Sequence, residues 1–92
     1  MVLTINPSKF ADFVEDNEGK IYAPRYFQEA ELMELSKKIA LIIAKQYITE
    51  EETVIKGSKF HNLLDEAEIE FDRNVVKALM ELQDNDYFEM SI

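Results

Sequence analysis

The 92-residue chain is long enough for one domain with a modest core, and none of its apolar runs is long enough to cross a membrane. Its net charge of −9 opposes binding to anionic lipid or nucleic acid and favours partners with basic surfaces. The absence of cysteine excludes disulfides, a thiol nucleophile and thiolate metal sites, and it suits the reducing cytoplasm. We therefore expect a single cytoplasmic domain over residues 1–92.

The first predicted elements are short. Residues 1–5 alternate loosely between apolar and polar types, a pattern typical of a short strand or an arm. Asn6 and Pro7 then favour a helix start, because asparagine caps helices and proline loses no hydrogen bond at the first helical position. We predict a helix over residues 7–16, followed by a loop over residues 18–23 that contains a short extended piece.

The dominant predicted helix spans residues 24–47. Apolar residues cover more than half of its circumference, so it needs covering on several sides. One of its faces carries Leu32, Leu35, Ile39, Ile42 and Ile43. At about 1.5 Å per residue the helix is roughly 36 Å long, whereas a domain of this size is about 30 Å across. Either the helix breaks or one end projects and finds a partner. We favour the partner and expect a homodimer formed through this 24–47 helix.

A capping box follows, because Thr49 and Glu52 have the spacing that closes the first turn of a helix. We predict a short helix here that ends at Gly57, and a next helix capped by Ser58.

From Ser58 onward, the apolar spacing predicts a helix-turn-helix over about residues 58–82, whose second helix is capped by Asp72. The expected inward-facing residues are Phe60, Leu63, Leu64 and Ala67 in the first helix and Val75, Val76, Leu79, Met80 and Leu82 in the second. Residues 84–85 have turn chemistry, and residues 87–92 alternate weakly enough to form an edge strand.

This order of elements in residues 39–92 resembles the winged-helix domains of small transcription regulators. In those domains the last helix ends at a leucine and a turn leads into the wing, as in the run Leu-Gln-Asp-Asn-Asp-Tyr-Phe-Glu-Met that starts at Leu82. The predicted fold is therefore mainly α: a small helical domain with a winged-helix-like C-terminal half and at most a short β element.

The charge of this half is opposite to that of a DNA-binding domain. Residues 49–92 hold four Lys or Arg against twelve Asp or Glu, whereas residues 1–48 hold six against seven. DNA binding depends on neutralising phosphates. In the recognition-helix position that the resemblance implies, only Arg73, Asn74 and Lys77 suit contact with DNA. Many winged-helix domains are thought to have become protein-binding modules, and the charge favours that branch.

No pattern of catalytic or metal-ligating residues stands out. His61 and Asp65, one helical turn apart, are only two ligands, so we interpret His61 as a surface or boundary residue. The acidic run over residues 65–72 lacks the glycine of a calcium loop. The phenylalanines are flanked mainly by acids, which favours core positions over base stacking. We predict no enzyme activity, no cofactor and no metal site.

Two functions remain. In the first, the protein is a regulator or inhibitor that either docks on a basic surface of a partner protein or imitates DNA to occupy the partner's nucleic-acid-binding site. Glu66, Glu68 and Glu70 are the predicted acidic contacts, and Tyr22 and Tyr26 are the predicted exposed aromatic anchors. In the alternative, the protein is a dimeric transcription regulator that reads DNA with Arg73, Asn74 and Lys77.

Overall fold

The computed structural model describes residues 1–28 and 32–92, and its elements overturn the predicted fold class. Of the described residues, 52% are helical and 17% lie in strands, and these strands form one three-stranded and one two-stranded antiparallel sheet. The prediction of a mainly α fold with at most a short β element is therefore wrong. The protein is an α/β mixture in which strands form one side of the core.

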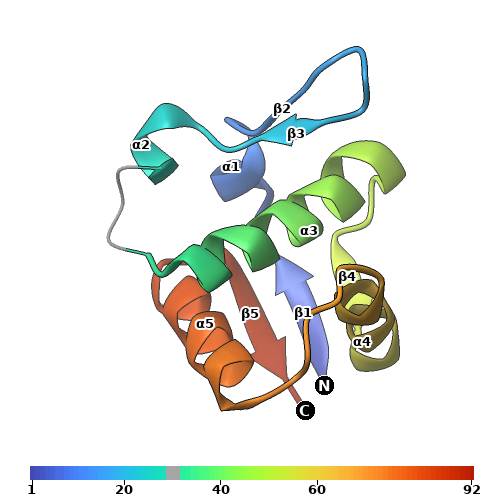
Figure 1. The fold of residues 1–92 in the computed structure, drawn as a ribbon, viewed down its shortest axis with the longest axis vertical. Coiled ribbons are helices and arrows are strands. Elements are labelled where there is room, and N and C mark those ends of the chain that lie inside the picture. Colours follow the sequence, from blue (N-terminus) through green and yellow to red (C-terminus); the bar gives the residue numbers. More distant parts are fainter. Residues whose placement is uncertain (29–31) are drawn as a thin grey trace.

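The larger sheet joins segments that are far apart in the sequence. Its central strand β1 (Val2–Ile5) lies between β4 (Val54–Lys56) and β5 (Phe88–Ser91) (Figure 1). Leu3 pairs with Ile55 on one side and with Met90 on the other. The edge strand predicted at residues 87–92 is confirmed, and residues 1–5, predicted as a strand or an arm, contain a strand. Their pairing was not foreseen, because nothing local in either segment indicates the other as its partner.

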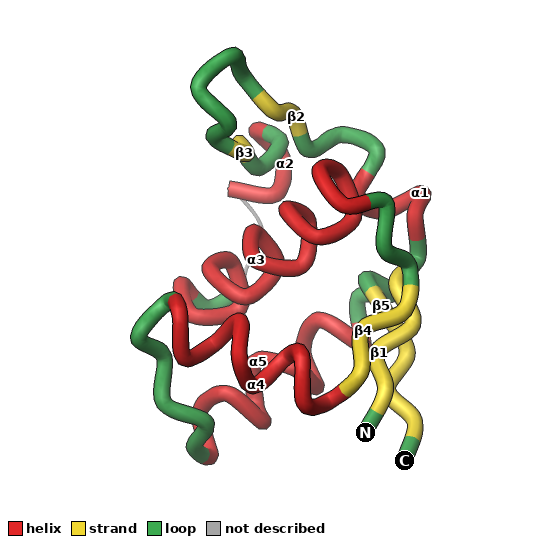
Figure 2. The backbone as a smooth tube through the Cα atoms, turned by 90° about the vertical axis from the view of Figure 1, so that its right-hand side faces the viewer, coloured by secondary structure: helices red, strands yellow, loops and turns green. Residues whose placement is uncertain are grey.

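The core lies between this sheet and three helices. In Figure 2 the three strands run together along one side of the molecule, and α3 (Glu34–Glu50), α4 (Gly57–Glu66) and α5 (Arg73–Asp84) occupy the other. Leu3 and Ile5 point inward from β1 and Thr4 points to solvent, as alternation along a half-buried strand requires. The fully buried residues of α3 are Ser36, Ile39, Ala40, Ile43 and Ala44.

The long 24–47 helix is not continuous. The structure contains a short helix α2 (Arg25–Gln28) and then α3, which begins only at Glu34. Met33 before it has extended backbone, with ψ of 150°, and residues 29–31 of the predicted helix lie outside the described ranges. Phe27 is buried against the ring of Phe13, so the packing of α2 on the N-terminal segment turns the chain away from the axis of α3. A single 36 Å helix therefore does not exist, and the argument for a projecting end fails.

The helix predicted after Thr49 is also wrong. Thr49 lies in the last turn of α3, where its hydroxyl donates to the carbonyl oxygen of Lys45, and Glu51 ends the helix in a left-handed conformation. Residues 54–56 form β4 because β-branched residues favour a strand and β1 offers a partner. Ser58 is not a cap either: α4 begins at Gly57 after Lys56, with no side-chain hydrogen bond at the cap.

The helix predicted over residues 7–16 is much shorter. Only α1 (Pro7–Phe10) is helical, and β2 (Val14–Glu15) pairs with β3 (Ile21–Tyr22) to form a hairpin. Phe10 and Phe13 are both buried, whereas Val14 is exposed. The strand β3 is the short extended piece that we expected within residues 18–23.

The two helices predicted within residues 58–82 are confirmed as α4 and α5, and the cap by Asp72 is confirmed too. The Asp72 carboxylate accepts the backbone N–H groups of Asn74 and Val75 at 2.9 and 3.1 Å. Five of the expected inward residues of these helices are buried: Phe60, Leu64, Val75, Leu79 and Leu82. The other four are not: Leu63 is half-buried, and Ala67, Val76 and Met80 are exposed.

Aromatic side chains join the N-terminal segment to the rest of the core. The Phe10 ring packs edge-on against Tyr87 with ring centres 5.4 Å apart, and Phe27 packs against Tyr87 at 5.5 Å. Five of the six phenylalanines are buried as expected, and the exception is Phe71, which is 39% exposed. Burial raises the pKa of Tyr87 to about 12, and the nearby Tyr26 adds to this increase.

Candidate protein-binding surfaces

The acidic segment, defined here as residues 65–72, joins the end of α4 to the start of α5. Its five carboxylate side chains are exposed, and they belong to Asp65, Glu66, Glu68, Glu70 and Asp72. Within the described ranges no ion pair involves any of them. Of the five, only the Asp72 side chain accepts hydrogen bonds within the described protein, where it caps α5. Four carboxylates of this segment are therefore available to a partner.

The backbone of the acidic segment is held in place. Ile69 donates its N–H to the carbonyl of Leu64 at 2.9 Å, and Glu68 donates to Asp65 at 3.0 Å. Glu68 has a left-handed conformation with φ of 58°. This is the Schellman ending of a helix, in which a residue with positive φ lets the chain close on the last turn. The half-buried side chain of Ile69, the residue after Glu68, packs against the core at this helix end. The carboxylates thus project from an ordered turn.

The residues predicted to read DNA lie at the start of α5. Arg73, Asn74 and Lys77 are all exposed, as that role requires, and within the described part of the chain neither Arg73 nor Lys77 forms an ion pair. The exposed Val76 and Met80 belong to the same helix. The exposed residues of α5 are thus less acidic than the segment that precedes it.

The two predicted aromatic anchors are exposed and held by carboxylates. Tyr22 is 50% exposed and donates its hydroxyl to Asp16 at 3.1 Å, and Tyr26 is 56% exposed and donates to Asp12 at 2.7 Å. Each hydrogen bond raises the pKa of its tyrosine. The pKa of Asp16 is lowered, above all by the backbone N–H of Lys20.

The structure does not bring the predicted contact residues into one surface. The strand β3 and the helix α2, which contain the two tyrosines, lie above α3 in Figure 1, whereas the link between α4 and α5 lies below it. A single small contact patch therefore does not include both groups.

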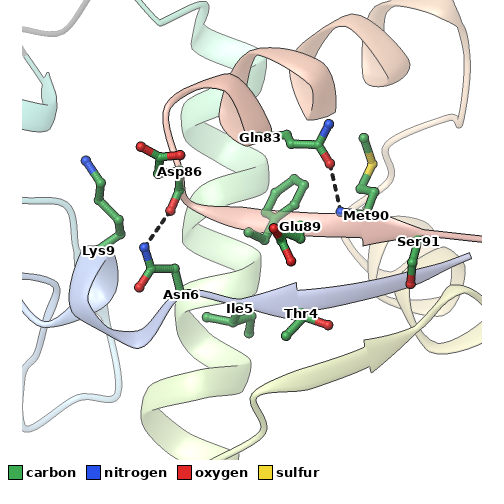
Figure 3. A pocket seen from close by; sticks show the side chains of 10 residues that line it. Thr4, Ile5, Asn6, Lys9, Gln83, Asp86, Glu89, Met90 and Ser91 are labelled. Atoms are coloured by element: carbon green, nitrogen blue, oxygen red, sulfur yellow. Dashed lines mark hydrogen bonds between the residues drawn. The ribbon is translucent and has the colours of Figure 1, made fainter.

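A polar hollow of about 780 Å³ lies over the exposed face of the larger sheet (Figure 3). At one end the Asn6 amide donates to the carbonyl of Asp86, and at the other Gln83 accepts the backbone N–H of Met90. This second contact covers a backbone group on the open edge of β5, which reduces the risk of strand pairing with other chains. The hollow is lined by Lys9, Asp86 and Glu89 and by the hydroxyls of Thr4 and Ser91, but neither hydroxyl donates a hydrogen bond to a described base, so we assign it no chemistry.

A smaller groove lies between α3 and α4. Its walls come from Ile42, Lys45 and Gln46 of α3 and from Leu63, Glu66 and Ala67 at the end of α4. The sequence interpretation missed it, because Ile42, Leu63 and Ala67 were all predicted in the core. The one feature of the sequence that pointed to a groove was Gln46, a polar residue next to the largely apolar surface of α3.

The remaining candidates for chemistry are isolated. His61 is exposed, and its ring lies 4.5 Å from that of Phe71. Among the described residues there is no group of three or more His, Cys, Asp or Glu side chains suited to hold a metal ion. Across the same residues, every helix is too short or too polar to traverse a bilayer.

The comparisons with protein-family models, with curated proteins and with solved structures found no match.

Proposed function

We propose that this protein is a non-enzymatic protein-binding module, a regulator or inhibitor that docks on a basic surface of its partner. The acidic segment carries this proposal. Asp65, Glu66, Glu68 and Glu70 are exposed, and no described residue forms an ion pair with them. Lysine and arginine side chains of a partner could therefore pair with these carboxylates without first breaking an ion pair inside the protein.

The charges would act mainly on the choice of partner and on the rate of encounter. A single exposed ion pair contributes only about 0–1 kcal/mol, so four carboxylates alone do not make a tight complex. Complementary potentials raise association rates and exclude partners of the same sign. The affinity must then come from apolar contacts beside the acidic segment.

The basic surface of the partner would be a nucleic-acid-binding site. Duplex DNA presents about one charge per 1.7 Å of its axis, and the acidic segment places several carboxylates on a short ordered stretch of chain. Occupying such a site would inhibit the partner. We propose a cytoplasmic location, which suits a chain without cysteine.

Tyr22 and Tyr26 are proposed as a separate contact. Their rings are fixed by hydrogen bonds to Asp16 and Asp12, so little side-chain freedom would be lost on binding. A partner that touched both the tyrosines and the acidic segment would have to extend past α3. The homodimer remains a prediction, but a continuous 24–47 helix is no longer its basis. Sedimentation giving a mass near 10.8 kDa at high micromolar concentration would rule the dimer out.

A winged-helix DNA-binding regulator is the second candidate. The observation that favours it is the order α3, β4, α4, α5 and β5 with Arg73, Asn74 and Lys77 exposed at the start of α5. The acidic segment directly before α5 opposes it, because the same approach would bring carboxylates toward phosphates.

Capture from extracts of the cells that express the protein tests the first candidate. The wild type should retain proteins with basic surfaces, and Glu66→Lys, Glu68→Lys and Glu70→Lys together should release them. The matched control reverses Glu50, Asp84 and Glu89, three exposed acids outside the acidic segment, and changes the net charge by the same amount. Equal retention by both triple variants would refute the proposed role of the acidic segment.

A fluorescence titration with duplex genomic fragments at physiological salt tests the second candidate. The first proposal requires no measurable affinity. Tight, sequence-selective binding that is lost in Arg73→Ala with Lys77→Ala would instead establish the DNA-binding function.

A further inference from the structure

The groove between α3 and α4 has the features of a peptide-binding site. Its volume is about 240 Å³, below the roughly 300–1,000 Å³ of pockets that enclose small-molecule ligands. Half-buried Ile42 and Leu63 and the exposed Ala67 provide apolar walls. A hollow of this size and lining suits one apolar side chain of a protein rather than a free metabolite.

Gln46 is the most informative residue of the groove. It is only 8% exposed, yet its side-chain amide forms no hydrogen bond with any described residue. No described side-chain nitrogen or oxygen is fully sealed from solvent without a partner, so the Gln46 amide keeps some access to solvent. Gln46 is one of the residues that line the groove, so the groove is an open space beside this side chain. A nearly buried amide with both a donor and an acceptor thus lies at a hollow that combines apolar Ile42, Leu63 and Ala67 with polar Lys45 and Glu66.

An amide of this kind matches a peptide backbone. Its oxygen accepts and its NH₂ group donates, so it can pair with the N–H and C=O groups of a bound segment. Solvent can pair with this amide while the groove is empty, and an occupant that displaced the solvent without replacing its hydrogen bonds would leave a nearly buried polar group unpaired. The amide therefore selects a peptide over a purely apolar occupant.

The charges at the rim select the sequence of that peptide. Glu66 belongs both to the groove and to the acidic segment, so carboxylates continue from the groove along the link toward α5. Lys45 stands on the α3 side. A bound segment with lysine or arginine next to its apolar side chain would place its cation at Glu66 and keep it away from Lys45.

We propose that the α3–α4 groove binds a short basic segment of the partner protein. One apolar side chain of that segment lies between Ile42 and Leu63, its backbone pairs with the Gln46 amide, and its lysine or arginine contacts Glu66. This inference rests on the proposed protein-binding function and supplies the apolar contact that the acidic segment by itself lacks.

Methyl and amide NMR with a defined probe tests the proposal. The probe is the blocked peptide Arg-Ala-Leu-Ala-Arg, compared with a second peptide in which alanine replaces its leucine and a third in which glutamate replaces both arginines. At millimolar concentration the first peptide should shift the signals of Ile42, Leu63, Ala67 and the Gln46 side-chain amide, and the other two should bind more weakly. No shift at these residues, or equal binding of all three peptides, would overturn the proposal.

Two variants and one matched control locate the contact. Ala67→Trp should fill the groove and abolish the shifts, whereas Ala11→Trp, the same change at another exposed alanine, should leave them intact. Gln46→Leu should weaken binding roughly three- to tenfold, the worth of about one neutral hydrogen bond. Unchanged binding by Ala67→Trp would refute the site. Thermal unfolding of each variant checks that it is folded.

The same variants separate this proposal from the function on which it rests. If charge reversal of Glu66, Glu68 and Glu70 releases captured partners and Ala67→Trp does not, the function stands and the groove proposal fails. If Ala67→Trp abolishes peptide binding but charge reversal leaves capture unchanged, the groove binds peptides and the proposed basic-surface function fails.

Discussion

The hairpin of β2 and β3 and the acidic segment are both rich in carboxylates, but they use them in opposite ways. In the hairpin, Asp16 accepts the backbone N–H groups of Glu18 and Lys20 and the hydroxyl of Tyr22. Asp12 accepts from Tyr26, and Glu18 pairs with Lys20. In the acidic segment only Asp72 has such a use, in capping α5. Charge counts alone therefore do not locate a binding surface; hydrogen-bond partners distinguish structural acids from available ones.

This difference follows from the local chain. A tight loop between two strands brings backbone N–H groups toward one acceptor, and an aspartate is short enough to reach them. The turn after α4 closes instead through backbone carbonyls of Leu64 and Asp65, so the side chains of Glu66, Glu68 and Glu70 are not needed for it. The hairpin depends on its acids for its shape, whereas the turn after α4 does not depend on Glu66, Glu68 or Glu70.

The largest expected effect is a loss of folding stability when a charge is placed in the core, on which both regions depend. Ile43 is fully buried and Ile42 is half-buried on the groove wall. Ile43→Asp should cost of the order of 4 kcal/mol or more, because it buries an unpaired charge, whereas Ile42→Asp should cost about 1–2 kcal/mol. Urea denaturation of both variants gives the two values. Equal costs would mean that the two faces of α3 do not differ as described.

The hairpin should lose stability when its central acid is removed. Asp16→Ala deletes three hydrogen bonds, whereas Glu15→Ala, a change at a neighbouring exposed acid, deletes none. The urea midpoint should fall in the first variant and stay unchanged in the second. The pKa of Asp16 is lowered from 3.8 in the folded state, so its contribution exists above that pH and is lost as the pH falls below it. The two variants should therefore converge in strongly acidic solution. A constant difference between them would contradict this assignment.

The raised pKa of Tyr87 predicts a loss of stability at alkaline pH. Its pKa is about 12 in the folded protein against about 10 for an exposed tyrosine. The unfolded chain then releases the proton first, so stability should be constant below about pH 10 and fall as the pH rises toward 12. Tyr87→Phe should reduce this fall, and Tyr22 and Tyr26, whose pKa values are also raised, should account for part of what remains. Denaturant titrations across this range measure the slope; identical slopes for Tyr87→Phe and wild type would exclude the assigned role.

The smallest expected effect lies within the acidic segment. Glu68 has positive φ, which costs a residue with a side chain roughly 1–2 kcal/mol and glycine almost nothing. After allowance for the greater freedom of glycine in the unfolded chain, Glu68→Gly should raise the free energy of unfolding by about 0.5–1 kcal/mol. Glu70→Gly removes the same charge at a residue without positive φ and should not stabilise. A loss of stability in Glu68→Gly would mean that its carboxylate has a structural role.

The sequence predicted best what short-range chemistry determines. Asp72 as a cap, the two helices around it and the strands at both ends of the described chain all follow from local residue types. The failures have long-range causes. Whether residues 49–56 continue as helix or form β4 depends on β1, more than forty residues away, which supplies the pairing partner. The helical pattern of residues 24–47 also gave no sign of the extended backbone at Met33 or of the contact of Phe27 with Phe13, which lies outside that pattern.

For the candidate surfaces, too, local features were predicted from the sequence and long-range ones were not. The exposure of Glu66, Glu68 and Glu70 and of Tyr22 and Tyr26 was predicted from composition and spacing, and the structure places all five at the surface. Their separation, the hydrogen bonds that fix the tyrosines and the groove at Gln46 depend on how α3, α4 and the hairpin pack. No periodicity in one helix indicates a hollow between two of them.

The most direct test of the central claim is an NMR titration of the side-chain carboxyl signals with a hexalysine peptide at low salt. We predict that the largest shifts occur at Asp65, Glu66, Glu68 and Glu70, with little change at Asp12 and Asp16, whose oxygens already accept internal hydrogen bonds. Shifts of equal size at all exposed acids, or shifts centred on the hairpin, would contradict the account.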